Sequence, residues 1–276
     1  MDEKTLKRIS GYIARVARFD DKGHLSAILT YHGVHPDGIK NCVPLIRFQE
    51  HLDFLQKHFS VVSLKQLLDL LTSGNSEKER YIALTFDDAY VNFLQFAYPE
   101  LKKRNLPSTL FVPAGLLGSY NHWDFDHDSS YRKLDIMTAE QLCQLDSSLV
   151  EIGSHSLTHA RMSRLSDSDL DKEIGQSKEI LEQEINRSVK FFAYPYGELA
   201  DFDERAVTLL KKYKYEAAVT THFGRKNEKT NRFKLKRISV WDDDTVNDLR
   251  IKLSGPYDWL APKEKLAYSI KQLASK

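Results

Sequence analysis

The sequence predicts an α/β fold, namely a distorted (β/α) barrel with about seven parallel strands. Short apolar runs alternate with helical patterns, titratable residues follow several of these runs, and 276 residues suffice for one large α/β domain. Parallel strands carry ligands and catalytic groups at their carboxyl ends, so we expect the functional site where the apolar runs stop.

The expected elements alternate along the chain. The expected strands are 27–33, 81–88, 108–112, a run starting at 150, 189–194, 216–220 and 236–240. The expected helices are 48–58, 64–71, 90–104, 138–145, 167–185 and 203–213.

We divide the chain into an N-terminal amphipathic helix over residues 1–20 and a barrel domain over residues 21–276. Leu6, Ile9, Ile13 and Val16 recur at helical spacing, and basic residues occupy the remaining surface. Such a helix either covers one end of the domain or makes peripheral contact with an anionic membrane surface.

Composition excludes some classes of function. Forty basic residues against 39 acidic ones give a net charge of +1, which argues against a nucleic-acid partner. Cys42 and Cys143 are too few and too isolated for a disulfide framework. The sequence has no apolar run of membrane-spanning length and no hydrophobic signal core at its start, so we expect a cytoplasmic location.

Two adjacent carboxylates, Asp87 and Asp88, end the strand that begins at Tyr81. Like charges this close repel, and a bound cation is the expected remedy. The alternative is a pair of solvated turn aspartates that cap a helix starting near Ala89.

A second strand-like run, from Val150, ends in His155 and His159. Residues four apart lie on one face of a helical turn, from which both imidazoles can reach one divalent ion. With an aspartate from elsewhere they would complete a His-His-Asp set that leaves positions open for water and substrate. Neither the aspartate pair nor the histidine pair is strong evidence for a metal site by itself. Two histidines at this spacing also occur as surface or core pairs. The coincidence of the two pairs favours metal-dependent hydrolysis.

The loop over residues 121–133 is long and contains Trp123 and Asp124. Aromatic faces and carboxylates suit a sugar-binding rim, and a plain surface loop is the alternative.

Three motifs together resemble the first three signatures of the polysaccharide deacetylases, the chitooligosaccharide deacetylase superfamily. They are Thr85-Phe86-Asp87-Asp88, His155-Ser156-Leu157-Thr158-His159 and Phe192-Ala193-Tyr194-Pro195-Tyr196-Gly197. The likeness covers roughly residues 25–255. Tyr31-His32-Gly33-Val34 and Arg237-Ile238-Ser239-Val240 are similar to the branch that acts in bacterial exopolysaccharide and lipopolysaccharide synthesis.

This resemblance implies a seven-stranded distorted barrel and a divalent metal, commonly zinc, that serves to remove N- or O-acetyl groups from sugars. Carried over by position, Asp88, His155 and His159 would bind the metal and Asp87 would be the general base. The backbone N–H of Tyr196 would stabilise the charge that develops on the acetyl oxygen.

The chain departs from the family pattern at three places. Ala89 replaces a frequent glycine, so the backbone there is less free to turn. Ala193 stands where an arginine usually orients the base, and Arg237 is the candidate substitute, with a plain surface cation as the alternative. The usual Leu-x-His near the C-terminus is missing, so His32 is the preferred general acid and His222, on an expected loop, is the alternative.

The sequence therefore predicts a metal-dependent deacetylase of an N-acetylated amino sugar in a cell-envelope glycan or its lipid-linked precursor. The expected partner is an N-acetylated sugar or oligosaccharide, and the enzyme is expected in the cytoplasm or at the inner membrane face. Two rivals remain: a deformylase of a lipid-linked aminosugar, and a non-catalytic sugar-binding or scaffold protein that keeps the barrel.

Overall fold

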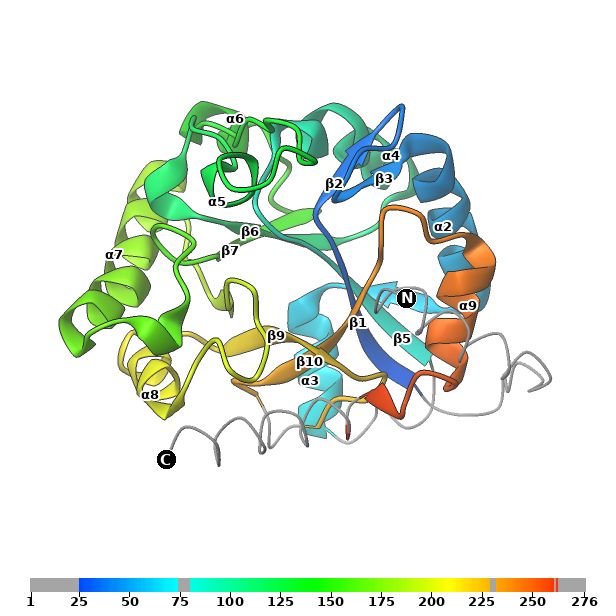
Figure 1. Ribbon diagram of the computed structural model, residues 1–276. Coiled ribbons are helices and arrows are strands. Elements are labelled where there is room, and N and C mark those ends of the chain that lie inside the picture. Colours follow the sequence, from blue (N-terminus) through cyan, green and yellow to red (C-terminus); the bar gives the residue numbers. More distant parts are fainter. Residues whose placement is uncertain (1–24, 74–79, 229–231, 261, 263–276) are drawn as a thin grey trace.

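The structure is a computed structural model that describes residues 25–73, 80–228, 232–260 and 262. Among these residues, seven parallel strands pair into a closed ring, which confirms the predicted barrel (Figure 1). The ring closes where the strand Leu25–Tyr31 pairs with the strand Arg80–Phe86, from Leu25 opposite Arg80 to Tyr31 opposite Phe86. In ring order the strands are β1 (Leu25–Tyr31), β10 (Leu235–Ser239), β9 (Ala217–Phe223), β8 (Phe191–Ala193), β7 (Val150–Ser154), β6 (Ser108–Val112) and β5 (Arg80–Phe86).

Three short strands lie outside this ring. β4 (Ser60–Val62) pairs with the first half of β5, whereas β6 pairs with its second half. β2 (Gly33–His35) and β3 (Cys42–Pro44) form a separate pair directly after β1. β5 therefore has a bonded neighbour on both sides along its length.

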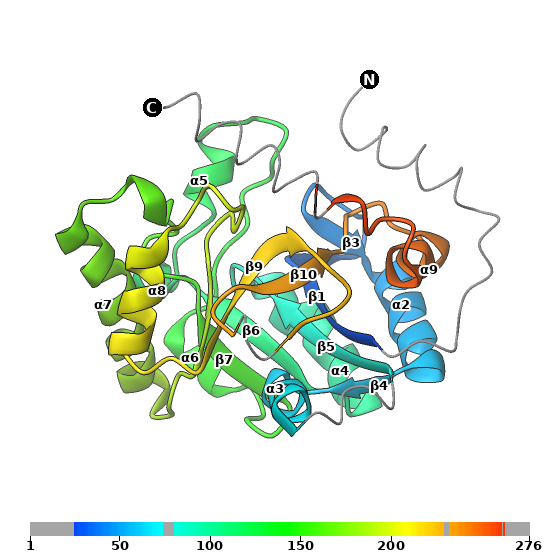
Figure 2. The same cartoon turned by 90° about the horizontal axis from the view of Figure 1, so that it is seen from below.

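Helices cover the outside of the ring. α7 and α8 lie on one side of the strands and α2 and α9 on the opposite side in both views (Figures 1 and 2). Among the described residues the α-helices are α2 (Leu45–His58), α3 (Leu64–Ser73), α4 (Tyr98–Arg104), α5 (His122–Phe125), α6 (Ala139–Cys143), α7 (Asp167–Ile185), α8 (Glu204–Lys212) and α9 (Val246–Ser254).

The expected helix over 90–104 is confirmed from residue 91 to residue 104, but part of it is π-helical. Asp88 and Ala89 have φ angles of 71° and 51°, so the chain makes a left-handed turn before any helix can begin. A π-helical stretch, Phe93–Ala97, then leads into α4. Sequence periodicity did not reveal this turn, because the pattern of apolar residues carries no information on the φ angles of single residues.

The two faces of the strands belong to different parts of the core. Ala83, Phe191 and Val219 form one cluster with the leucines of α3, which recur at helical spacing. Since residues two apart share a strand face, the same inward parity places Asp87 above Ala83 and His155 beyond Gly153. The interior of the barrel is thus apolar beside α3 and becomes polar toward the carboxyl ends of the strands.

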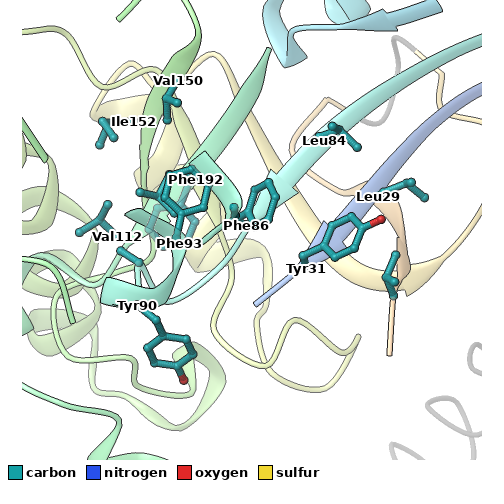
Figure 3. Packing of buried hydrophobic residues seen from close by; sticks show 14 of the residues in the cluster. Leu29, Tyr31, Leu84, Phe86, Tyr90, Phe93, Val112, Val150, Ile152 and Phe192 are labelled. Atoms are coloured by element: carbon teal, nitrogen blue, oxygen red, sulfur yellow. The ribbon is translucent and has the colours of Figure 1, made fainter. Parts of the chain in front are cut away.

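The other cluster combines aliphatic side chains with aromatic rings (Figure 3). The ring centroids of Tyr31 and Phe86 are 5.3 Å apart, and those of Phe86 and Phe93 are 4.8 Å apart. Burying each such ring contributes about 2 kcal/mol or more, so the ends of β1 and β5 are firmly supported.

Two predictions are not tested by this fold. The amphipathic helix over 1–20 lies outside the described residues, so the predicted boundary at residue 20 stays a prediction.

No described helix has both the length and the apolar character that a membrane span requires.

Candidate metal centre

Three buried side chains from two strand ends converge on one point. Asp88 Oδ1 lies 3.4 Å from His155 Nε2 and 3.5 Å from His159 Nε2. One potential ligand atom of each residue lies within 4.8 Å of the others, and each residue is at most 6% exposed. The structure thus brings together the three residues that the sequence analysis assigned to a metal.

The turn after β5 aims Asp88 at this point. Its φ of 71°, followed by 51° at Ala89, makes a left-handed turn immediately after the strand. A left-handed conformation costs a non-glycine residue roughly 1–2 kcal/mol. Ala89 therefore makes the turn that a glycine would make at lower cost, and the surrounding structure must hold it.

The two histidines do not share a helical turn, so that expectation is wrong. Residues 155–161 form an irregular loop in which Ser156 and His159 have φ angles of 66° and 61°. The hydroxyl oxygen of Ser156 accepts a hydrogen bond from the His159 N–H at 3.0 Å. Left-handed residues interrupt any helix here, yet the loop still delivers both imidazoles to Asp88.

The donor set fits a divalent cation. His155 Nδ1 donates to the Ala193 carbonyl at 2.8 Å, which leaves the Nε2 lone pair of the neutral ring directed at Asp88. Asp88 Oδ1 is buried and has no hydrogen-bond partner among the described residues. A buried carboxylate oxygen without a donor, facing two imidazole nitrogens, is an arrangement that a cation satisfies.

Electrostatics favour ligand-competent forms of the aspartate and of one histidine. Burial alone would raise the pKa of Asp88, but the neighbouring imidazoles outweigh it and hold that pKa well below its usual range. Burial lowers the pKa of His159 to about 3, so its ring is neutral at pH 7. For His155, burial is outweighed by Asp88 and Asp87, and the pKa is raised.

A second carboxylate lies beside this set, paired with a fully buried guanidinium. Arg237 Nη1 and Nη2 donate to the two oxygens of Asp87 at 2.7 and 2.6 Å, and Arg237 Nε donates to the Thr220 carbonyl. Burial alone would raise the pKa of Asp87, but Arg237, together with His155, lowers it. Arg237 is thus no surface cation, and it occupies the position expected of a substitute for the missing family arginine.

The other sequence candidates lie around the same centre. His32 follows β1, is half-buried, and acts electrostatically on both Asp87 and Asp88. Tyr196 is left-handed at φ 61°, and its ring centroid lies 4.9 Å from that of His159. No hydrogen bond from the Tyr196 backbone N–H is found within the described part of the chain.

His222 is not a loop residue, contrary to expectation. β9 extends to Phe223, so His222 is a buried strand residue whose N–H donates to the Thr220 hydroxyl oxygen at 3.2 Å. The predicted strand ended at residue 220 because the residues that follow, Thr221 and His222, are polar. The pairing of β9 with β10 nevertheless continues to Phe223.

Two contacts of the site were not assigned from the sequence. The Trp123 ring stacks on the His159 imidazole with centroids 4.0 Å apart, so the 121–133 segment reaches one of the candidate metal ligands. Glu173 of α7 binds the loop between the two histidines. A usable signal existed for Glu173, because a carboxylate beside Leu170 and Ile174 lies on the buried face of its helix.

The fold and site together define a (β/α)-barrel protein with a buried donor set that suits a divalent cation. The family model for polysaccharide deacetylase matches residues 74–218, more than half of the 276 residues. The chain therefore belongs to the polysaccharide deacetylase family and is a carbohydrate deacetylase, as its motifs predict.

Individual relatives agree with this assignment. Poly-beta-1,6-N-acetyl-D-glucosamine N-deacetylase of Staphylococcus aureus (strain MSSA476) is 29% identical over 215 residues, covering 74% of this chain and 70% of that protein. YxkH of Bacillus subtilis (strain 168) is 25% identical over 214 residues, covering 77% of this chain and 70% of that protein.

Solved structures share the fold. The Streptococcus pyogenes deacetylase PplD, in complex with acetate, superposes with a TM-score of 0.70 and 21% identity, covering 84% of this chain and 99% of that one. IcaB from Ammonifex degensii also gives a TM-score of 0.70, with 20% identity, covering 83% of this chain and 96% of that one.

Proposed function

We propose that the protein hydrolyses the N-acetyl group of an amino sugar in a bacterial cell-envelope glycan or its lipid-linked precursor, with the help of a divalent metal. The observation that carries the proposal is the buried convergence of Asp88, His155 and His159 beside the Asp87–Arg237 pair. Family membership supports the reaction, and the name of the Staphylococcus aureus relative supports an N-acetylglucosamine polymer as the substrate class.

Asp88, His155 and His159 would hold the cation, and zinc is the expected ion because two imidazoles and a carboxylate are ligands it accepts. When bound, such an ion polarises the acetyl carbonyl and increases the acidity of water. Metal analysis of the purified protein tests the choice of ion.

Asp87 would accept the proton of the attacking water. Its lowered pKa keeps it ionised at neutral pH, which a general base requires. Arg237 would fix the direction of the carboxylate through its two hydrogen bonds.

The two remaining roles belong to groups on the loops. The N–H of Tyr196 would donate to the acetyl oxygen as negative charge develops there. His32 would give a proton to the leaving nitrogen. It belongs to the motif Tyr31-His32-Gly33-Val34, which resembles the family, and its charge would lower the pKa of both Asp87 and Asp88.

Replacement of Asp87 by asparagine tests the function. We expect Asp87→Asn to lower acetate release from N-acetylglucosamine oligomers by about 10²- to 10⁴-fold while metal binding persists, because the base is lost and the ligands stay. Asp69→Asn, at an exposed position on α3, is the control and should leave acetate release unchanged. Full activity of Asp87→Asn would refute the assignment.

Replacement of His32 by glutamine tests the general acid. N-deacetylation should fall, whereas hydrolysis of an aryl acetate should persist, because a phenolate leaves without needing a proton. Equal loss on both substrates would argue against a proton-donor role, and His222→Gln is the comparison variant.

The location in the cytoplasm, with residues 1–20 at the inner membrane face, stays a prediction from the sequence. Cell fractionation with an antibody against the full chain measures it directly.

A further inference from the structure

The loop between the two histidines is bound to α7 by one buried carboxylate. Oε2 of Glu173 accepts hydrogen bonds from the backbone N–H groups of Leu157 and Thr158, both at 2.9 Å. Oε1 accepts a hydrogen bond from the Thr158 hydroxyl group, with 2.5 Å between the two oxygens. Glu173 is only 7% exposed and comes from a different element than the loop, so it acts as an external anchor for the segment that carries His159.

This loop needs an anchor, because its backbone conformation is unfavourable for its residues. Ser156 and His159 are both left-handed, at φ 66° and 61°, although neither is glycine. Such a conformation persists only when surrounding contacts fix it. Glu173 binds the two residues that lie between these positions.

The two metal-ligand candidates are held in different ways. The His155 ring is fixed through its Nδ1 by the Ala193 carbonyl. The Nδ1 of His159 is buried and has no hydrogen-bond partner among the described residues, so no bond of this kind orients its ring. The position of the His159 ring therefore depends on its backbone and on the rings of Trp123 and Tyr196 that lie against it.

We propose that Glu173 is a positioning residue for the metal centre: by fixing residues 157 and 158 it places the His159 imidazole, and it thereby sets the affinity of the site for a divalent cation. The carboxylate does not itself belong to the converging donor set. The inference rests on the metal site of the proposed function, but it requires nothing about the sugar substrate.

Metal titration of the chelator-treated protein tests this role. Co²⁺ binding, followed by calorimetry and by the visible absorption of the bound ion, should weaken about 10- to 100-fold in Glu173→Ala, the range typical of lost outer-shell partners. Glu173→Gln should weaken binding less, by about three- to tenfold, because an amide has one acceptor oxygen where the carboxylate has two.

Glu179→Ala is the matched control, since Glu179 is exposed on the same helix and has no described contact with the loop. It should bind Co²⁺ like the wild-type chain. Melting temperatures of the metal-free variants separate loss of the site from loss of the fold, and Glu173→Gln decides the question if Glu173→Ala does not fold.

The outcomes separate the two proposals. Wild-type affinity in the folded Glu173 variants would overturn the positioning role while leaving the metal site intact. An absence of Co²⁺ binding by the wild-type chain would instead overturn the metal site itself. Equal weakening in Glu179→Ala would reduce the effect to general destabilisation of α7 and would also overturn the positioning role.

Discussion

Two carboxylates at opposite ends of the barrel, Asp87 and Glu151, have pKa values shifted in opposite directions. At the carboxyl end, Asp87 is fully enclosed, yet its pKa lies below the usual range because Arg237 binds both of its oxygens. At the amino end, Glu151 near the start of β7 is only partly buried, yet burial raises its pKa to about 7. Lys190 and Lys65 act on Glu151 only through their charge. For these two groups the depth of burial does not decide the direction of the pKa shift, because only Asp87 has a cation bonded to both of its oxygens.

The two ends of the barrel also differ in where their left-handed residues lie. At the amino end, left-handed residues follow helices, as Asn105 does after α4 and Lys214 after α8, where such a residue is the usual way to end a helix. At the carboxyl end, left-handed Asp88, His159 and Tyr196 are residues of the site. Unfavourable conformations thus serve chain reversal at one end and side-chain placement at the other.

The largest effect should come from separating the buried ion pair. Arg237→Met should lower the free energy of unfolding by about 3–5 kcal/mol, because Asp87 stays buried without its cation. Denaturant unfolding measures this loss, and deacetylation should fall with it.

Two further variants sharpen this test. Arg205→Met removes an arginine whose side chain is 40% exposed, and it should cost about 1 kcal/mol or less. The double variant Asp87→Asn/Arg237→Met should recover part of the stability lost in Arg237→Met, since neither charge is left unpaired. A loss below 1 kcal/mol in Arg237→Met would contradict the comparison.

An intermediate, pH-dependent effect is expected at the amino end. Between pH 4.5 and 7 the native state keeps a proton on Glu151 that the unfolded chain releases, so this group makes the fold less stable as pH rises through that window. Glu151→Gln should remove the penalty and stabilise the protein by about 1–2 kcal/mol at pH 8. The full pKa shift would give more, but partial exposure reduces it.

Unfolding titrations at pH 4.5 and pH 8 measure this difference, which should vanish at the lower pH. Glu179→Gln, at an exposed position, should show no change at either pH. A Glu151→Gln variant that is no more stable than the wild type at pH 8 would show that solvent, and not burial, governs this carboxyl group.

The smallest effect is expected where a left-handed residue only ends a helix. Lys214→Gly should raise the free energy of unfolding by about 0.5–1 kcal/mol without altering activity, because glycine adopts the φ of 59° without strain. Asn105→Gly should raise the free energy of unfolding by only about 0.2–0.4 kcal/mol, since asparagine already tolerates the left-handed region. A destabilised Lys214→Gly would indicate that its side chain contributes more than its backbone strain costs.

The sequence predicted the fold well where the pattern was strong. The predicted bounds of α7 and β6 match the structure, because each is a long periodic or fully buried run. The predicted strand 189–194 shrank to Phe191–Ala193 and the strand from 216 extended to Phe223, because pairing with neighbouring strands, which a single sequence does not show, sets such limits.

For the site, the sequence indicated which residues converge but not how. Asp88, His155 and His159 were singled out as residues that follow strands, and the structure brings them together. The helical turn assumed for the histidines was wrong, since the left-handed conformations of Ser156 and His159 depend on contacts that a four-residue spacing does not show. The helical pattern of α7 indicates that Glu173 is buried, but only the three-dimensional structure shows that Glu173 bonds to the histidine loop and that Trp123 stacks on His159.

β5 is hydrogen-bonded to β1 along one edge and to β4 and then β6 along the other. Amide protons in the middle of this strand should therefore exchange with solvent only when the whole domain opens. Asp87 and Asp88 therefore follow a rigid strand, whose position should not change when a ligand binds. Adaptation to sugars of different shape must then come from the loops above it, which can change in length and composition while the barrel stays as it is.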